Sequence, residues 1–302
     1  MNMLINWYNL KNPLNFLNIF GNDNPVDCEI GFGEGDFLLK KCKNEPERNF
    51  IGIEYSKVCT RKALKKINNY NLNNIRLILL DAESAFDMLI PEISLDNIYI
   101  NFPDPWPKNK HEKRRLLDRD FSILTSSRLK DNGKVHILTD HTFYRDFILE
   151  EMSYYGVLRP LFNNGYKEKT DDTILTKYEK KWRSEGRKIY YIVLQKVIHP
   201  FYERKIRYED IKDGNVKLKN DFERFYKKAI KDNNSLAKIT GIKRLQDKIE
   251  IETILKDWSL FQKCKITLIP DKMNEYKLII PENVFRSYSL KLLLESIFST
   301  NN

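Results

Sequence analysis

Short apolar strands alternate with helical patterns over the first two thirds of the chain, and this alternation limits the possible folds more than any other feature. Helix patterns fill most of the gaps between strands, starting near Asp36, after the N-cap candidate Ser56, and near Thr142. Strand–helix–strand units favour parallel pairing, with the helices covering the sheet. The sequence therefore predicts an α/β fold with a seven-stranded, mostly parallel sheet, whose strands lie at residues 26–30, 50–53, 75–80, 98–100, 134–138, 157–161 and 189–194.

A glycine-rich turn, Gly31-Phe-Gly-Glu-Gly35, connects the first strand to its helix. Glycines let a ligand approach the backbone closely, and the helix aims its free N–H groups at that ligand. The second strand ends in Glu54, roughly 20 residues further on, where an acid often binds ribose hydroxyls. The third strand closes on Asp81-Ala82. Together with Glu29, these acids predict a nucleotide-binding cleft at the carboxyl edge of the sheet.

Two nucleotide cofactors compete for such a cleft, a nicotinamide dinucleotide and S-adenosylmethionine. Glycines at 31, 33 and 35 follow the spacing GxGxG, whereas the pyrophosphate fingerprint is GxGxxG. Glu29 and Glu34 also bring negative charge to the turn, which repels a pyrophosphate but suits a sulfonium and its ammonium group. These features favour S-adenosylmethionine.

The fourth strand runs into a proline-rich segment, Asn101-Phe-Pro-Asp-Pro-Trp-Pro-Lys108. Each proline fixes its own φ and favours extended geometry in the residue before it, so we expect Asp104 to be a carboxylate on a stiff, extended arm.

A basic cluster follows, where the next helix should begin. Each cation at a helix N-terminus costs about 0.3–1 kcal/mol when solvated, so the cluster predicts a bound anion such as a phosphate. The alternative is a solvated, polar helix start. The cluster consists of Lys108, Lys110, Lys113, Arg114 and Arg115.

These motifs, together with Thr139-Asp140 and Thr176-Lys-Tyr-Glu179, resemble the bacterial tRNA (guanine-N7)-methyltransferases over roughly residues 25–197. The resemblance implies a class I S-adenosylmethionine-dependent methyltransferase, with a Rossmann-like fold, that methylates N7 of guanine 46 in the tRNA variable loop. By motif, it implies cofactor contacts at Glu29, Glu54, Asp81 and Asp104, with Asp104 also the catalytic residue. From the glycine turn and the end of the third strand we add Gly31, Gly33, Gly35 and Ala82 as cofactor contacts. The resemblance places substrate contacts at Lys108, Asp140, Thr176, Lys177, Tyr178 and Glu179, and we add Lys110, Arg114 and Arg115 from the basic cluster.

The residues agree with this chemistry. Guanine N7 has an in-plane lone pair and no proton, so its attack on a methyl sulfonium needs no general base. The purine gains positive charge instead, and a fixed carboxylate such as Asp104 would stabilise it and position the ring.

Ordinary structural roles compete with the functional ones at several positions. Asp81 and Glu54 could be solvated or capping acids, Asp140 could cap the helix that begins near Thr142, and Thr176 with Glu179 could form a capping box. A tRNA-binding protein without activity, or a methyltransferase for another substrate, is the alternative for the whole chain.

The chain of 302 residues is long enough for a domain of about 200 residues and a smaller one. We predict an N-terminal arm at 1–24, a catalytic domain at 25–200 and a basic α+β appendage at 201–302, with His199-Pro200 at the boundary. The formal charge of +10 favours a polyanionic partner.

Residues 201–302 carry 21 Lys and Arg against 15 Asp and Glu. They form either an RNA-binding appendage or a module that only packs or dimerises. A predicted helix near 221–231 would gather the aromatic and basic side chains that favour RNA, namely Phe222, Phe225, Tyr226, Lys227 and Lys228.

Four cysteines lie scattered without a CxxC pair, so we expect reduced thiols and no metal. No signal peptide and no run of about 18 apolar residues is evident. These observations predict a cytoplasmic protein. The resemblance implies tRNA as its partner, and we expect a monomer or homodimer with no stable protein partner.

Overall fold

The computed structural model describes residues 3–11, 13–107, 109–170, 177–232, 234–272 and 275–299. The chain divides into two compact units, one made of Met1–Ile5 with Pro13–Glu203 and the other of Asn6–Asn12 with Arg204–Asn302. Residues 6–12 therefore group with the C-terminal unit. From the sequence, residues 1–24 were expected to be a loosely attached arm or a short helix, and a short helix does form at Phe16–Phe20.

The first unit is built on an eight-stranded mixed sheet with the order β3-β2-β1-β4-β5-β8-β6, to which β7 adds by pairing with β8. The pairs from β3 to β5 are parallel, and β8 runs antiparallel to its neighbours. The predicted α/β sheet is confirmed, and only the short strand β7 was missed. The strands are β1 (Val26–Ile30), β2 (Asn49–Glu54), β3 (Ile75–Leu79), β4 (Leu95–Asn101), β5 (Leu129–Thr139), β6 (Leu158–Pro160), β7 (Tyr166–Glu168) and β8 (Tyr190–Lys196).

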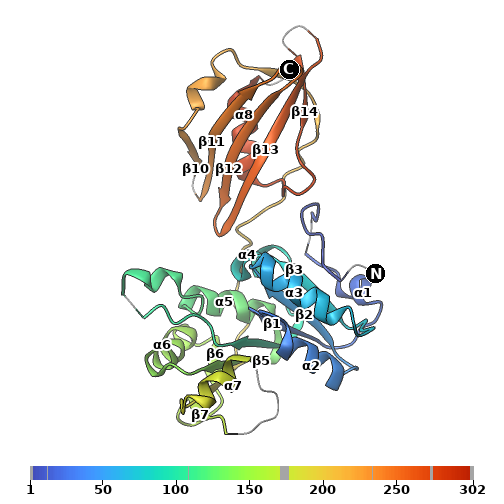
Figure 1. Ribbon diagram of the computed structural model, residues 1–302. Helices are drawn as coiled ribbons and strands as arrows, with labels where there is room; N and C mark the ends of the chain where they lie inside the picture. Colours follow the sequence, from blue (N-terminus) through green and yellow to red (C-terminus); the bar gives the residue numbers. More distant parts are fainter. Residues whose placement is uncertain are drawn as a thin grey trace. The chain divides into compact units, whose positions relative to one another are not determined.

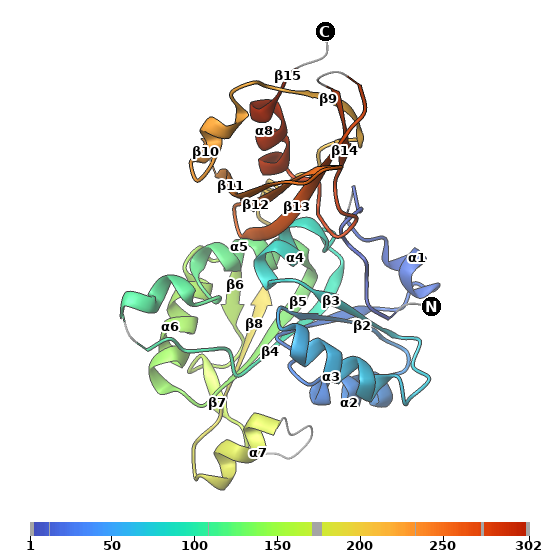
Figure 2. The ribbon, with the colours of Figure 1, turned by 45° about the horizontal axis from the view of Figure 1, so that its top comes forward.

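Helices cover both faces of this sheet, with α2 and α3 on one face and α4 and α5 on the other (Figures 1 and 2). Ser56 caps α3 as predicted, because its side chain accepts from the N–H of Cys59. Leu38 of α2 and Ala63 of α3 are buried in an apolar core that these two helices form with β2. The helices are α1 (Phe16–Phe20), α2 (Asp36–Asn44), α3 (Lys57–Ile67), α4 (Ala82–Met88), α5 (Arg119–Arg128), α6 (Thr142–Ser153) and α7 (Lys177–Ser184).

Two local predictions in this unit were wrong. The basic cluster does not begin an α-helix but forms the 3-10 helix η1 (Asn109–Arg114). The α-helix α5 begins only after Asp118, whose side chain caps it by accepting from the N–H of Phe121. Asp131-Asn-Gly133 is a turn signal in the sequence, but the structure has an irregularity inside β5 there, with Asn132 at φ +61°.

The second unit is a seven-stranded antiparallel sheet with the order β10-β11-β12-β13-β14-β9-β15. It curves around the single long helix that the described part of this unit contains, α8 (Tyr288–Ile297) (Figure 1). The apolar side chains of one sheet face and of α8 form one core. The strands are β9 (Gly214–Leu218), β10 (Ala229–Asp232), β11 (Ser235–Arg244), β12 (Ile249–Asp257), β13 (Leu260–Pro270), β14 (Glu275–Ile279) and β15 (Phe298–Ser299).

This unit corrects the expected α+β appendage, because it is an all-β sheet apart from α8. The helix predicted at 221–231 does not form. A short 3-10 turn, η2 (Phe222–Phe225), is followed by Lys227 at φ +59° and then by strand β10. A left-handed residue cannot continue an α-helix, so the chain turns into the sheet.

The N-terminal segment contributes residues to both units. Residues 3–5 extend the first sheet, since Ile5 donates to the carbonyl of Leu77 and Leu77 donates to that of Met3. Trp7 is 4% exposed, and its ring centroid lies 6.2 Å from that of Phe285 in the C-terminal unit.

We predict that Trp7→Ala lowers the free energy of unfolding of the C-terminal unit by about 3 kcal/mol, because removing a buried indole leaves a cavity. Urea unfolding of the full chain measures this loss. The control is Leu17→Ala, which removes a side chain that is 58% exposed and should change stability by less than about 0.5 kcal/mol. Equal midpoints for Trp7→Ala and the wild type would contradict the prediction.

Candidate active site

The strand order brings the predicted acids together. β2, β1 and β4 are neighbours, so Glu29 near the end of β1, Glu54 at the end of β2 and Asn101 at the end of β4 lie along one edge of the sheet. In open α/β sheets ligands bind outside the carboxyl ends of the strands, where the strand order reverses, and here that reversal falls between β1 and β4.

Glu29 is the most deeply buried of these acids, at 2% exposed. Its Oε1 accepts from Asn101 Nδ2 at 3.0 Å, while its buried Oε2 has no hydrogen-bond partner among the described residues. Burial raises the pKa of Glu29 to about 8, and the nearby Glu54 carboxylate adds to the shift. A buried carboxyl group that has one free oxygen and no ion-pair partner among the residues described fits a positively charged ligand group, such as an ammonium.

Glu54 connects the glycine turn to the next helix. Its Oε2 accepts from the N–H of Gly33 at 3.0 Å and its Oε1 from the N–H of Ser56 at 2.8 Å. Each oxygen keeps a second lone pair, so Glu54 can still accept from ligand hydroxyls.

The glycines form an open cradle beside Glu54. Gly31 and Gly33 adopt φ values of +71° and +54°, which other residues rarely do, and a Cβ on either would meet no atom within 4 Å. Gly35 serves packing instead, since a Cβ there would lie 3.0 Å from that of Ala63.

Asp81 serves as the N-cap of α4, and Ala82 is the first residue of that helix. Asp81 accepts from the N–H of Ser84 at 2.9 Å, and burial raises its pKa. The capping alternative is therefore correct for Asp81, and it leaves part of the carboxyl group available to a ligand.

Asp104 lies exposed in the proline-rich segment, but the backbone around it is not uniformly extended. Phe102 and Trp106 adopt φ values of +55° and +39°, where a residue before proline was expected to be extended. Such conformations cost on the order of 1–3 kcal/mol each and persist only where the surroundings enforce them. At the start of the segment, the N–H of Phe102 donates to the carbonyl of Leu138 at 2.8 Å.

Arg115 holds the other end of the segment, which corrects its predicted role as a substrate contact. Its side chain is only 2% exposed. Nε donates to the carbonyl of Pro105 and Nη2 to that of Trp106, both at 3.2 Å. The guanidinium lies 4.4 Å from the ring centroid of Phe147 in α6. This arginine therefore positions the segment that carries Asp104, and it is not available to a phosphate.

Two other cations of the basic cluster are better placed than Arg115 to bind an anion. Arg114 and Lys110 are exposed, and the Arg114 guanidinium lies 5.0 Å from the Trp106 ring. Lys108 lies outside the described residues.

The remaining predicted substrate residues come from β5 and α7. Asp140 forms an ion pair with Arg187 at 2.8 Å and does not cap α6, because His141 does so by accepting from the N–H of Tyr144. Glu179 is fully buried and accepts from Lys169 at 3.0 Å and Arg183 at 2.8 Å, so in this arrangement it offers no surface to a substrate. Thr176 lies outside the described residues, and of Lys177 and Tyr178 only the backbone is described.

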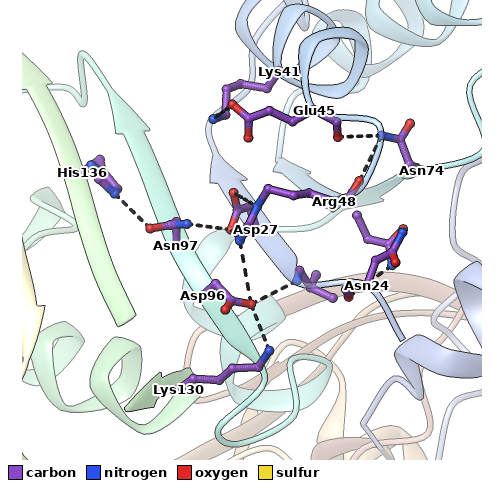
Figure 3. A network of polar contacts seen from close by, with 12 residues as sticks. Asn24, Asp27, Lys41, Glu45, Arg48, Asn74, Asp96, Asn97, Lys130 and His136 are labelled. Carbon is purple, nitrogen blue, oxygen red and sulfur yellow. Dashed lines mark hydrogen bonds and ion pairs between the residues drawn. The ribbon is translucent and has the colours of Figure 1, made fainter. Parts of the chain in front are cut away.

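Sequence reasoning missed a second polar cluster, which links β1, β4 and β5 (Figure 3). Asp27 is fully buried and accepts from Arg48 at 2.6 and 3.0 Å and from Asn97 at 2.9 Å. Asn97 contacts His136 at 3.1 Å, and burial lowers the pKa of this histidine to about 4. The signal for this cluster was Asp27 itself, two residues before Glu29 on the same side of a strand.

The described residues hold no group of three His, Cys, Asp or Glu side chains that could bind a metal ion. Nor does any helix in the described part of the chain have the length and apolar character needed to cross a membrane.

The mixed sheet, the glycine cradle at the point where the strand order reverses and the acids around it define a class I S-adenosylmethionine-dependent methyltransferase fold. A family model described as a putative methyltransferase matches residues 23–192, more than half of the chain. This chain belongs to the tRNA (guanine-N7)-methyltransferase family.

Three relatives carry the name tRNA (guanine-N(7)-)-methyltransferase. The protein from Thermotoga maritima is 34% identical over 262 residues, covering 78% of this chain and 82% of the relative. One from Buchnera aphidicola is 38% identical and covers 61% of this chain and 77% of the relative. One from Aquifex aeolicus is 33% identical, and the match covers 69% of this chain and 67% of the relative. The Thermotoga match covers more than the length of residues 1–203, so it extends into the C-terminal unit.

We predict that Arg115→Lys lowers kcat on the order of 100-fold, because a lysine cannot hold both carbonyls and a shift of about 1 Å at Asp104 has this effect. KM for S-adenosylmethionine should stay near its original value. The control is Arg145→Lys, because Arg145 also stacks on aromatic rings, 4.1 Å from the Tyr166 centroid, but its hydrogen bond goes to Asp146. A kcat loss matched by the control would contradict the positioning role.

Glu29 should give the free protein a characteristic pH dependence. Its folded pKa of about 8 lies above the ordinary 4.5, so its contribution to stability is full below pH 4.5 and is lost as the pH rises through 8. Glu29→Gln should remove this decline, which unfolding free energies between pH 4.5 and 8 would show. Binding of an ammonium ligand at pH 7 should also release a proton, measurable by calorimetry in two buffers of different ionisation enthalpy. An unchanged pH profile in the variant would contradict this assignment.

Proposed function

We propose that this chain transfers the methyl group of S-adenosylmethionine to N7 of guanine 46 in the variable loop of tRNA, in the cytoplasm. The observation that supports it best is the free buried oxygen of Glu29 beside the open glycine cradle. Membership of the family selects the substrate, because the named relatives are tRNA (guanine-N(7)-)-methyltransferases.

The cofactor-binding residues have distinct tasks in this proposal. Glu29 binds the amino group of the cofactor with its free oxygen, and Glu54 accepts from ribose hydroxyls while it holds Gly33. Asp81 and Ala82 present the start of α4 to the base. When bound, S-adenosylmethionine supplies a methyl group on a positively charged sulfur.

Asp104 acts on the other reactant. Guanine N7 carries no proton, so the carboxylate need not remove one and instead faces the positive charge that the purine acquires. Its segment is held at Phe102 by β5 and at Pro105 and Trp106 by Arg115, so the charge is in place before the reaction. A carboxylate fixed in advance stabilises the transition state without reorganising during the reaction.

The RNA contacts lie beside this acid. Arg114 and Lys110 are exposed next to the proline-rich segment, and a guanidinium or ammonium there suits the phosphates that flank the target guanine. Asp140 and Glu179 are held by ion pairs in the free protein. We propose that they reach the substrate once tRNA phosphates compete for Arg187 and Arg183.

Incubation with labelled S-adenosylmethionine and unmodified tRNA tests the reaction, with the same tRNA carrying adenine at position 46 as the comparison. We expect transfer only to the guanine version, with the product cleavable as N7-methylguanine. Transfer to neither would point to another substrate for the same cleft.

We predict that Asp104→Asn lowers kcat by about 100- to 1000-fold, because the amide lacks the charge that faces the purine. The melting temperature should not change, since Asp104 is exposed. Asp120→Asn, another exposed aspartate, is the matched control and should keep full activity. Wild-type turnover in the Asp104 variant would remove this residue from the mechanism.

A further inference from the structure

The C-terminal sheet has a second face, turned away from α8, that the catalytic proposal does not use. Along β12 the side chains alternate strictly: Ile251 and Leu255 are fully buried in the core, while Ile254 is partly exposed and Lys256 is exposed on the other side. The helix therefore covers one face of the sheet and leaves the opposite face with its own set of side chains.

The strand register arranges these outer side chains in two adjacent rows at one end of the sheet. In one row Lys231, Leu236, Lys256 and Phe261 are cross-strand partners. In the next row the partners are Ala229, Lys238, Ile254 and Lys263. Lysine and apolar residues thus alternate along both rows, and we call this surface the lysine face.

The lysine face contains no carboxylate. Its four lysines form no ion pair within the described part of the chain. Two lysines elsewhere on the same side of the sheet are paired, Lys265 with Glu250 at 3.0 Å and Lys217 with Glu275 at 3.5 Å. The lysine face therefore presents four cations that no carboxylate within its two rows neutralises.

Phe261 adds an aromatic surface to this charge. Its side chain is 54% exposed, and Lys263 Nζ lies 6.0 Å from the ring centroid. An exposed aromatic ring on a β-sheet, surrounded by cations, is the arrangement on which RNA bases stack while lysines contact the backbone. Lysines two strands apart lie about 10 Å from one another and the rows lie about 7 Å apart, so several can contact one stretch of backbone.

We propose that the lysine face binds the phosphodiester backbone of tRNA, with Phe261 stacking on an unpaired base. The proposal rests on the proposed function, since it assigns a second contact to the same substrate. It also replaces the original reason for expecting RNA here, because Phe222 is 2% exposed and belongs to the core of the sheet.

The test compares two double variants of the full chain, Lys238→Gln/Lys263→Gln on the lysine face and Lys217→Gln/Lys265→Gln among the ion-paired lysines. Both remove two charges from the same side of the sheet. Binding to unmodified tRNA is measured by fluorescence anisotropy between 50 and 200 mM salt. We expect affinity on the order of tenfold weaker at low salt in the first variant and a salt slope reduced by about 1.5, since each lost phosphate contact removes about 0.7–0.9.

The control should keep both the affinity and the salt slope of the wild type. The lysine-face variant should show a raised KM for tRNA with an unchanged kcat, because the reacting groups lie in the other unit. Phe261→Ala should weaken binding further without changing the salt slope.

Equal losses in the two double variants would mean that net charge alone matters, and wild-type binding by the lysine-face variant would mean that RNA does not contact this face. Either result overturns the inference, as would weakened binding to anionic phosphatidylserine vesicles with unchanged binding to tRNA. Methyl transfer by the wild type to guanine 46 is measured separately, so failure of this inference is distinguishable from failure of the proposed function.

Discussion

Two buried carboxylates, two residues apart on β1, determine how the catalytic unit is built. Asp27 receives hydrogen bonds from Arg48, which follows α2, and from Asn97 in β4. These contacts hold the chain segments on both sides of β1 in register (Figure 3). Glu29, further along the strand, accepts from Asn101 of the same strand β4 with Oε1, while its Oε2 has no hydrogen-bond partner in the described part of the chain. Burial of a carboxylate is costly without a partner, so the first acid stabilises the fold while the second keeps an unused oxygen for a ligand.

The proline-rich segment shows how the site holds an exposed acid in place. Proline removes backbone freedom but also N–H donors, so the segment has few hydrogen bonds of its own. Arg115 provides donors instead, and the aromatic rings of α6 hold its guanidinium. The unfavourable φ values of Phe102 and Trp106 are maintained by these outside contacts. Asp104 is therefore exposed and yet fixed.

The sequence was sufficient for features that depend on local pattern. The alternation of strands and helices, the glycine turn, the Ser56 cap and the acids at the strand ends all follow from spacing and residue type. The sequence pattern was misleading where tertiary packing overrides the local preference of a residue. Arg115 reads as one more cation of a basic cluster, but two carbonyls and two aromatic rings outside that cluster draw it into the interior.

The helix predicted in the C-terminal unit was wrong for a related reason. Phe222, Phe225 and Tyr226 have helical spacing, but Phe222 enters a core made mostly by distant strands, and Lys227 then turns the chain. Glu179 could not be read correctly either, since its partner Lys169 lies ten residues away outside α7, although its other partner Arg183 is four residues along the same helix. Contacts of this kind depend on the folded chain, and one sequence does not reveal them.

The N-terminal segment gives the C-terminal unit an unusual order of assembly. Residues 6–12 are synthesised well before the rest of this unit, yet Asn9 accepts a hydrogen bond from Arg286, 277 positions later. Contacts so distant in sequence form late and slowly, and domains otherwise tend to fold in turn as they leave the ribosome. The catalytic unit can close its sheet while the rest is still being translated. Trp7 can pack against Phe285 only after residue 285 has been added, so the indole of each new molecule lacks this partner while about 270 residues are translated.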